Sequence, residues 1–273
     1  MPELPEVETI KRGLKARLSG RKILKALVKD KTVLTGISPK GGPFRNVAIP
    51  EFEKNTAGKE VSGFARRGKY LIMEFSDKSA LIFHLRMTGQ LTLNPPQGNE
   101  RLCLFLSGGQ TLCFTDRRRF GEVIFSARWR DEKPFQSLGI EPLNGKLTAP
   151  FLKKAFARRT SPIHSLLLNQ TLVSGLGNIY VTEALFHAGI LPTRPAGRIS
   201  LDRLEKLASC IRQVLEKSIE NRGYSGIINL LWTSRLFAIT KRRGMITTWR
   251  IRSRPGWLYW EPRLSLCGKV GPT

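Results

Sequence analysis

Hydrophobic positions near the N-terminus recur with a helical period. They are Val7, Ile10, Leu14 and Leu18. This spacing predicts an amphipathic helix over residues 5–19. Pro5 stands in the first turn, where its missing N–H is tolerated, and Gly20 is a stop signal.

Between about residues 23 and 128 the pattern is typical of short strands. The strongest candidates are residues 69–75, 80–85, 101–106 and 111–115. The first two flank a polar turn over 76–79, and the last two flank Gly108 and Gly109. Short strands separated by turns predict a sandwich of antiparallel sheets.

From about residue 150 the helical period returns. The predicted helices are 151–159, 163–169, 179–188 and 201–221, with loops at 173–177 and 191–197. The fold class is therefore α+β. The predicted organisation is a β-sandwich domain over 1–130, a linker over 131–149, a helical domain over 150–223 and a distinct tail over 224–273.

The chain is strongly basic. Its 273 residues include 46 Lys and Arg against 21 Asp and Glu, for a formal net charge of +25. Such a chain favours a polyanionic partner, because phosphate contacts supply salt-dependent affinity. No apolar run approaches the ~18 residues of a membrane span, and no signal peptide is recognisable. We expect a cytoplasmic, nucleoid-associated protein without a membrane partner.

The first nine residues, MPELPEVET, carry candidate chemistry. Removal of Met1 would leave Pro2 as a free secondary amine, and an α-amino group titrates near ~7.7–8.0 against ~10.4 for lysine. A secondary amine that attacks a sugar aldehyde gives a charged iminium, which suits covalent cleavage of a glycosidic bond. The alternative interpretation is a prolyl turn before a helix, with Glu6 and Glu8 placed for the helix dipole.

This N-terminus resembles that of bacterial formamidopyrimidine-DNA glycosylases, in the formamidopyrimidine-DNA glycosylase / endonuclease VIII family. The resemblance implies that Pro2 is the nucleophile, Glu3 the acid/base and Glu6 a supporting carboxylate. It also implies an N-terminal β-sandwich with an N-terminal helix, followed by a helix–two-turn–helix domain.

Two further segments resemble parts of the family. In RRGKYL (66–71), the resemblance implies that Lys69 contacts the DNA backbone at the lesion and assists elimination. In HLRMTG (84–89), it implies that Met87 is pushed into the base stack where the damaged nucleotide is flipped out. Arg86 departs from the family here, where a glycine is typical.

The segment DRRRFG (116–121) resembles the family's void-filling loop. The resemblance implies that Arg118 and Phe120 fill the gap left by the flipped nucleotide and that Arg118 addresses the orphaned cytosine. On its own, the segment could equally be a solvated run of charge.

The segment 166–180, LLLNQTLVSGLGNIY, resembles the helix–two-turn–helix almost residue for residue. Its glycines would let backbone amides approach a phosphate, and the helix that begins near Asn178 presents free N–H groups. His164 stands where the family often has a phosphate-binding lysine. It could still donate one hydrogen bond, or it could be structural.

The C-terminal fifth departs from the family, whose members normally end in a zinc finger. The four cysteines are Cys103, Cys113, Cys210 and Cys267, and no CxxC pair occurs. This spacing cannot supply a four-thiolate zinc site, so we predict no metal and no cofactor. We expect Cys103 and Cys113 to be strand-core thiols, Cys210 to be a helix-core thiol, and the chain to have no structural disulfide.

Residues 224–273 contain nine Lys and Arg, a single acid at Glu261 and four of the five tryptophans. One explanation is a diverged finger without zinc, and the other is a frame change near codon 223. We favour the second, which predicts loose or irregular backbone and partly exposed tryptophans.

Three functions are therefore open. The leading one is a monomeric repair glycosylase that excises oxidised purines, such as formamidopyrimidine and 8-oxoguanine, and cleaves abasic sites in double-stranded DNA. The second is a catalytically impaired protein of the same fold that binds damaged DNA. The third is a basic RNA-binding protein, against which the Pro2–Glu3 pair argues.

Overall fold

The fold was analysed in a computed structural model that describes residues 2–37, 43–45, 47–94, 98–221, 238–242, 245–254 and 257–266. Over 37, 43–45, 238–242, 245–254 and 257–266 the description covers the backbone alone. The chain forms two compact units, Met1–Tyr224 and Ser225–Thr273, which are described separately.

The predicted N-terminal helix is confirmed as α1 (Leu4–Leu18). Pro5 stands in its first turn, and Glu3 and Glu6 form a reciprocal capping box at its start. The chain turns away after Ser19 through Gly20, whose φ of 77° lies in the left-handed region. The face toward the protein interior carries Leu4, Val7, Leu14 and Leu18.

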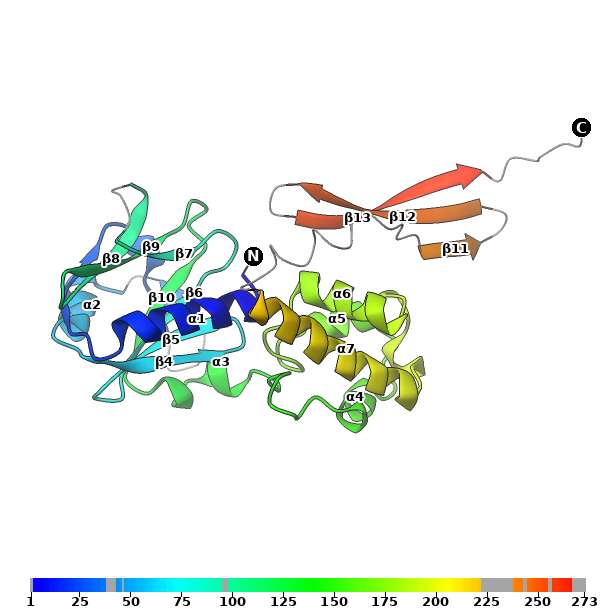
Figure 1. Cartoon of the computed structure of the whole chain (residues 1–273), viewed down its shortest axis with the longest axis horizontal. Helices are drawn as coiled ribbons and strands as arrows, with labels where there is room; N and C mark the ends of the chain where they lie inside the picture. The colour runs from blue at the N-terminus through cyan, green and yellow to red at the C-terminus, as the bar shows by residue number, and fades with distance from the viewer. Residues whose placement is uncertain are drawn as a thin grey trace, which may run out of the picture. The chain divides into compact units, whose positions relative to one another are not determined.

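The predicted antiparallel sandwich is also confirmed (Figure 1). One sheet has the order β1 (Ile23–Val28), β8 (Glu100–Leu106), β9 (Gln110–Thr115), β7 (Gln90–Leu93). The other has the order β10 (Glu122–Ser126), β6 (Ala80–His84), β5 (Tyr70–Phe75), β4 (Val61–Arg67). Both sheets contribute to one hydrophobic cluster, in which the rings of Phe83 and Phe114 lie 6.3 Å apart.

A short helix interrupts the region expected to contain strands. It is α2 (Ile49–Thr56), which has Pro50 in its first turn and buries Phe52 and Thr56. Two turns with so few buried positions give little helical periodicity, so the sequence did not reveal it. The 3-10 turn η1 (Lys31–Val33) and the hairpin of β2 (Thr35–Ile37) and β3 (Pro43–Arg45) precede it.

The expectation of free thiols at Cys103 and Cys113 is wrong, because the two residues form a disulfide. They lie directly opposite each other in the β8–β9 pair, with Cα atoms 4.2 Å apart. Directly opposed residues of antiparallel strands approach closely enough for such a bond, and spacing along the chain does not reveal that register. Cys210 is a buried free thiol, as expected.

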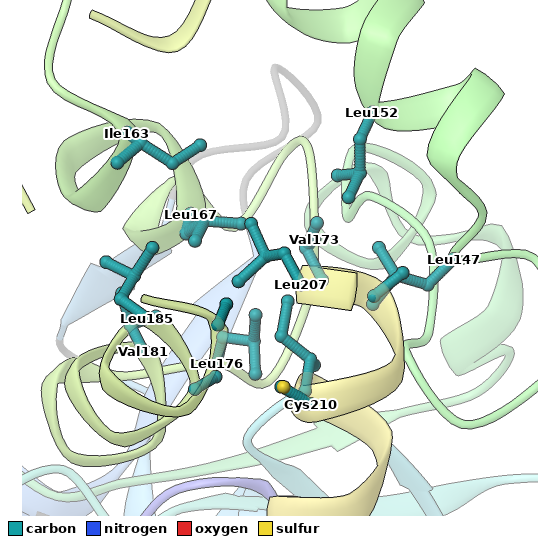
Figure 2. Packing of buried hydrophobic residues seen from close by; sticks show 14 of the residues in the cluster. Leu147, Leu152, Ile163, Leu167, Val173, Leu176, Val181, Leu185, Leu207 and Cys210 are labelled. Atoms are coloured by element: carbon teal, nitrogen blue, oxygen red, sulfur yellow. The ribbon is translucent and has the colours of Figure 1, made fainter. Parts of the chain in front are cut away.

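The helical part consists of α4 (Ala149–Phe156), α5 (Ile163–Leu168), α6 (Asn178–Ala188) and α7 (Leu201–Glu220). The short η3 (Ala196–Arg198) completes it, whereas η2 (Trp129–Asp131) and α3 (Lys133–Gln136) pack through Trp129 and Phe135 against the sheet that contains β5 and β6. Figure 2 shows side chains from these helices and the intervening loops converging on one core, including Leu167, Val173 and Leu207. Leu4 joins this core, which anchors the first turn of α1 in the helical part. None of the described helices is long and apolar enough to cross a bilayer.

The second unit contains a three-stranded antiparallel sheet in the order β11 (Ala238–Arg242), β12 (Met245–Arg254), β13 (Trp257–Leu266). The expectation of irregular backbone is therefore wrong for these segments. They are rich in Ile, Thr and Trp, which favour strands. Cys267 and the exposure of the tail's tryptophans lie outside the described residues.

Candidate active site

The Glu3 side chain is buried at the meeting point of α1 and α6. Only 2% of the residue is exposed, and its Oε1 accepts a hydrogen bond of 3.2 Å from the backbone N–H of Ile179. Its own backbone N–H donates to Glu6 Oε2 at 2.8 Å. The neighbouring Pro2 is half-buried. The capping box that starts α1 therefore also fixes the residue that follows the candidate nucleophile.

Two glycines of the loop before α6 make room for the N-terminal residues. A Cβ on Gly177 would lie 2.2 Å from the Glu3 carboxyl carbon, and one on Gly175 would lie 2.7 Å from a methyl group of Leu4. The Gly175 carbonyl also accepts a hydrogen bond of 3.1 Å from Leu4 N–H. The sequence analysis assigned these glycines to phosphate binding. It missed that their lack of a side chain leaves space for Glu3 and Leu4.

Burial sets the protonation of the central groups. It raises the pKa of Glu3 to about 7, against the opposing effects of Lys69 and the Ile179 N–H. Lys69 is buried as well, and burial lowers its pKa while Glu3 and Glu6 partly offset that effect. Near neutral pH the site therefore holds a carboxyl that can carry or release a proton, beside a lysine of reduced basicity.

Sequence reasoning missed two further residues beside Glu6. The buried hydroxyl of Tyr180 donates to Glu6 Oε1 and shares a hydrogen bond of 2.6 Å with Ser218 Oγ on α7. Burial and the Glu6 carboxylate both raise the pKa of Tyr180, so it remains a neutral donor. Tyr180 lies within the segment 166–180 that the sequence analysis describes. A tyrosine at that position does not by itself predict a contact with Glu6 or Ser218.

The turn that carries Met87 is held by its neighbours. Arg86 adopts φ +52°, so it keeps the left-handed backbone for which a glycine would be the usual choice. Its guanidinium pairs with Glu122 at 3.1 Å, and its backbone N–H donates to His84 Nδ1 at 3.2 Å. Burial and the nearby Arg86 lower the pKa of His84 to about 3, which keeps the ring neutral and able to accept. Met87 itself is half-buried.

The loop between β9 and β10 presents Arg118 and Phe120 to solvent. The Arg118 guanidinium carbon lies 4.9 Å from the centre of the Phe120 ring, and 47% of Phe120 is exposed. An exposed phenylalanine stacked on an arginine provides a flat surface suited to bases. Behind them lies Asp116, a buried residue that sequence reasoning treated only as the start of the charged run.

His164 and Asn178 lie side by side. His164 Nε2 and Asn178 Oδ1 are 3.0 Å apart. Because Asn178 is the first residue of α6, this pair adjoins the Ile179 N–H that holds Glu3.

The candidate residues thus form three groups. They are Pro2, Glu3, Glu6 and Lys69; Met87, Arg118 and Phe120; and His164 and Asn178. In the part of the chain described, no three His, Cys, Asp or Glu side chains are grouped to hold a metal. With Cys103 and Cys113 bonded to each other, the cysteines do not fit the four-thiolate zinc site of the family.

Two family models match the chain. One, described as the formamidopyrimidine-DNA glycosylase N-terminal domain, matches residues 1–123, and the other, described as the formamidopyrimidine-DNA glycosylase H2TH domain, matches residues 138–228. The formamidopyrimidine-DNA glycosylase of Pelotomaculum thermopropionicum is 40% identical over 82% of this chain and 79% of that protein. That of Rhizorhabdus wittichii is 39% identical over 82% of this chain and 80% of that protein.

Solved structures of formamidopyrimidine-DNA glycosylases are also similar to this chain. A Lactococcus lactis formamidopyrimidine-DNA glycosylase bound non-covalently to DNA containing an AP site superimposes with a TM-score of 0.76 and 28% identity. The match covers 94% of this chain and 96% of that one. A complex of the Lactococcus lactis protein with DNA containing Fapy-dG gives a TM-score of 0.77 at 28% identity, over 94% of this chain and 97% of that one.

Proposed function

The chain belongs to the formamidopyrimidine-DNA glycosylase family, and from this premise we propose that it excises oxidised purines from double-stranded DNA and then cleaves the strand. The substrates are formamidopyrimidine and 8-oxoguanine lesions and abasic sites. The observation that carries the proposal is the buried Glu3, which has a pKa of about 7 and lies between Pro2, Lys69 and the first amides of α6.

In this mechanism the Pro2 nitrogen attacks C1′ of the damaged nucleotide while the bond from C1′ to the base breaks. Glu3 in its protonated form supplies a proton at the sugar or the leaving base. The Pro2 nitrogen loses its proton, and the C1′–O4′ bond of the sugar ring then breaks as O4′ takes up a proton. The resulting iminium between Pro2 and C1′ acidifies the C2′ protons. Loss of a C2′ proton expels the 3′ phosphate, and a second elimination expels the 5′ phosphate. Lys69 assists these eliminations at the DNA backbone.

The other groups bind the DNA. Met87, Arg118 and Phe120 occupy the space that the flipped nucleotide leaves, which offsets part of the cost of its extrusion. Asn178 and His164 contact a phosphate beside the start of α6. The net charge of +25 supplies the remaining attraction to the backbone.

Borohydride trapping tests the proposal. Reduction of the iminium on abasic DNA should give a stable protein–DNA adduct, and peptide mapping should place it at residue 2. The matched control carries one additional residue before Pro2, which removes the free secondary amine, and it should give no adduct. An adduct at Lys69, or undiminished trapping by the blocked protein, would refute the role of Pro2.

A second candidate is a protein that recognises damaged DNA but turns over poorly. It is favoured by the absence of any CxxC pair, because the family's zinc finger is half of its DNA clamp. Tight binding to a duplex with an abasic-site analogue, together with no adduct on abasic DNA, would support this function over the first.

A further inference from the structure

Asp116 lies between the two loops that carry Met87, Arg118 and Phe120. Its side chain is completely buried at the end of β9. Its Oδ1 accepts hydrogen bonds from the hydroxyl of Thr88 and, at 3.1 Å, from the backbone N–H of Arg118. Its Oδ2 accepts a hydrogen bond of 2.6 Å from the backbone N–H of Gly121. One carboxylate thus holds the residue after Met87, Arg118 itself and the residue after Phe120.

We propose that Asp116 is a positioning residue that couples the Met87 turn to the Arg118–Phe120 loop, so that both loops meet the damaged base pair as one unit. Thr88 supplies the link from the first loop. The proposal rests on the function proposed above, because it assumes that these loops contact the lesion.

The backbone of both loops needs such support. Arg86 and Arg119 have φ values of +52° and +58°, in the left-handed region that is strained for residues with a side chain. Gln90 of β7 pairs with Thr115 of β9, which brings together the points where the two loops leave the sheet. That pairing ends before Asp116, so the hydrogen bonds to its carboxylate continue the connection beyond the sheet.

The charge of Asp116 is what allows one side chain to hold both loops. An ionised carboxylate accepts at both oxygens, whereas an amide accepts at one and donates at the other. The guanidinium of buried Arg101 lies 3.8 Å from Asp116 Oδ2 and also pairs with Asp30 at 3.0 Å. Hydrogen bonds from Thr88 and from the loop amides hold the pKa of Asp116 below its usual range, against the effect of burial.

The sharpest test compares Thr88→Val with Thr88→Ser. Valine preserves the shape and removes the hydroxyl, whereas serine keeps it. Thr88→Val should lower single-turnover excision of 8-oxoguanine from duplex about tenfold, the loss expected for a hydrogen bond to a charged acceptor. It should also lower the ratio of affinities for lesion-containing and undamaged duplex. Thr88→Ser should retain both, and trapping on single-stranded abasic DNA should be the same for all three proteins.

Asp116→Asn extends the test to the second loop. An asparagine cannot accept from the Thr88 side and the Gly121 side at once, so its loss of duplex excision and of lesion preference should exceed that of Thr88→Val. If Thr88→Val keeps both properties, or if valine and serine reduce them equally, the coupling is refuted. A parallel fall in trapping on single-stranded DNA would instead show a general structural defect and would also overturn the proposal.

Failure of the proposed function gives a different result. In that case the unaltered protein forms no adduct on abasic DNA. The coupling can then still be tested by binding alone. Thr88→Val should lower the ratio of affinities for lesion-containing and undamaged duplex, and Thr88→Ser should not.

Discussion

The two main groups of candidate residues, one around Glu3 and one around Arg118, differ in their exposure to solvent. Glu3 and Lys69 are buried, and burial displaces the pKa of each toward neutrality. Arg118 and Phe120 are exposed on a loop and stack on each other. The first group is suited to proton transfer, which needs a desolvated setting, and the second to contact with a large partner, which needs access.

The difference extends to how each group is held. Glu3 is fixed by elements distant in sequence, since its partners include Ile179, Gly177 and Lys69. The exposed loop is fixed from behind by Asp116, whose hydrogen-bond partners lie on the two loops themselves. Changes in the first group should therefore alter the chemistry, and changes in the second should alter the choice of DNA.

The largest effect should come from Glu3→Gln. Glutamine keeps the size of the side chain but cannot transfer a proton, so excision from duplex should fall by ~10²–10⁴-fold. Cleavage of preformed abasic sites should largely survive, because the base is already gone. Both rates can be measured on matched oligonucleotides. An equal loss of both activities would show that Glu3 acts structurally.

Gly177→Ala should have the next largest effect. The added Cβ would overlap the Glu3 carboxyl and displace it from the Ile179 N–H. A misplacement of about 1 Å can cost on the order of a hundredfold in rate, so excision should fall by that factor while affinity for duplex DNA persists.

The matched control for this change is Gly13→Ala on α1, where an added Cβ meets no atom within 4 Å. That variant should keep full activity, and alanine should suit the helix better than glycine. Full excision by Gly177→Ala would show that excision does not depend on the position of the Glu3 carboxyl at the Ile179 N–H.

The buried Glu3 should also make stability depend on pH. Its pKa rises from 4.5 to about 7 on folding, so the folded state holds a proton that the unfolded state has lost between these values. This stabilisation is present below pH 4.5 and is lost as pH rises through about 7. The difference is roughly 3 kcal/mol.

Urea unfolding of the unaltered protein and of Glu3→Gln at pH 5 and pH 8 isolates this contribution. Glutamine does not titrate, so the stability of the variant relative to the unaltered protein should increase with pH. Lys69 and Glu6 interact with Glu3 and are present in both proteins. Stability curves that stay parallel across this range would contradict a buried, titrating Glu3.

The sequence predicted the elements with strong periodicity and the residues within recognisable segments. α1 followed from four apolar positions, and the candidate nucleophile followed from the chemistry of an N-terminal proline. It did not predict α2, whose two turns bury only Phe52 and Thr56. Local pattern is sufficient where one helical face is continuously apolar, and it fails for short elements held by tertiary packing.

Contacts between distant residues were the other omission. The disulfide of Cys103 and Cys113 depends on the β8–β9 register, which a spacing of ten residues does not fix. The contact of Gly177 with Glu3 joins residues far apart in the chain. Asp116 was visible in the sequence, but its role comes from burial between two loops.

The smallest effect should come from the exposed group. Arg118→Ala should lower the preference for a lesion opposite cytosine over one opposite adenine by about tenfold, within the range for one arginine–base contact. Trapping on single-stranded abasic DNA and the free energy of unfolding should not change, because the side chain lies in solvent. Its exposed neighbour Arg117 is the control for lost charge, and Arg117→Ala should leave the preference intact. If both alanine variants reduce the preference equally, the loop attracts DNA by charge alone and does not distinguish the opposite base.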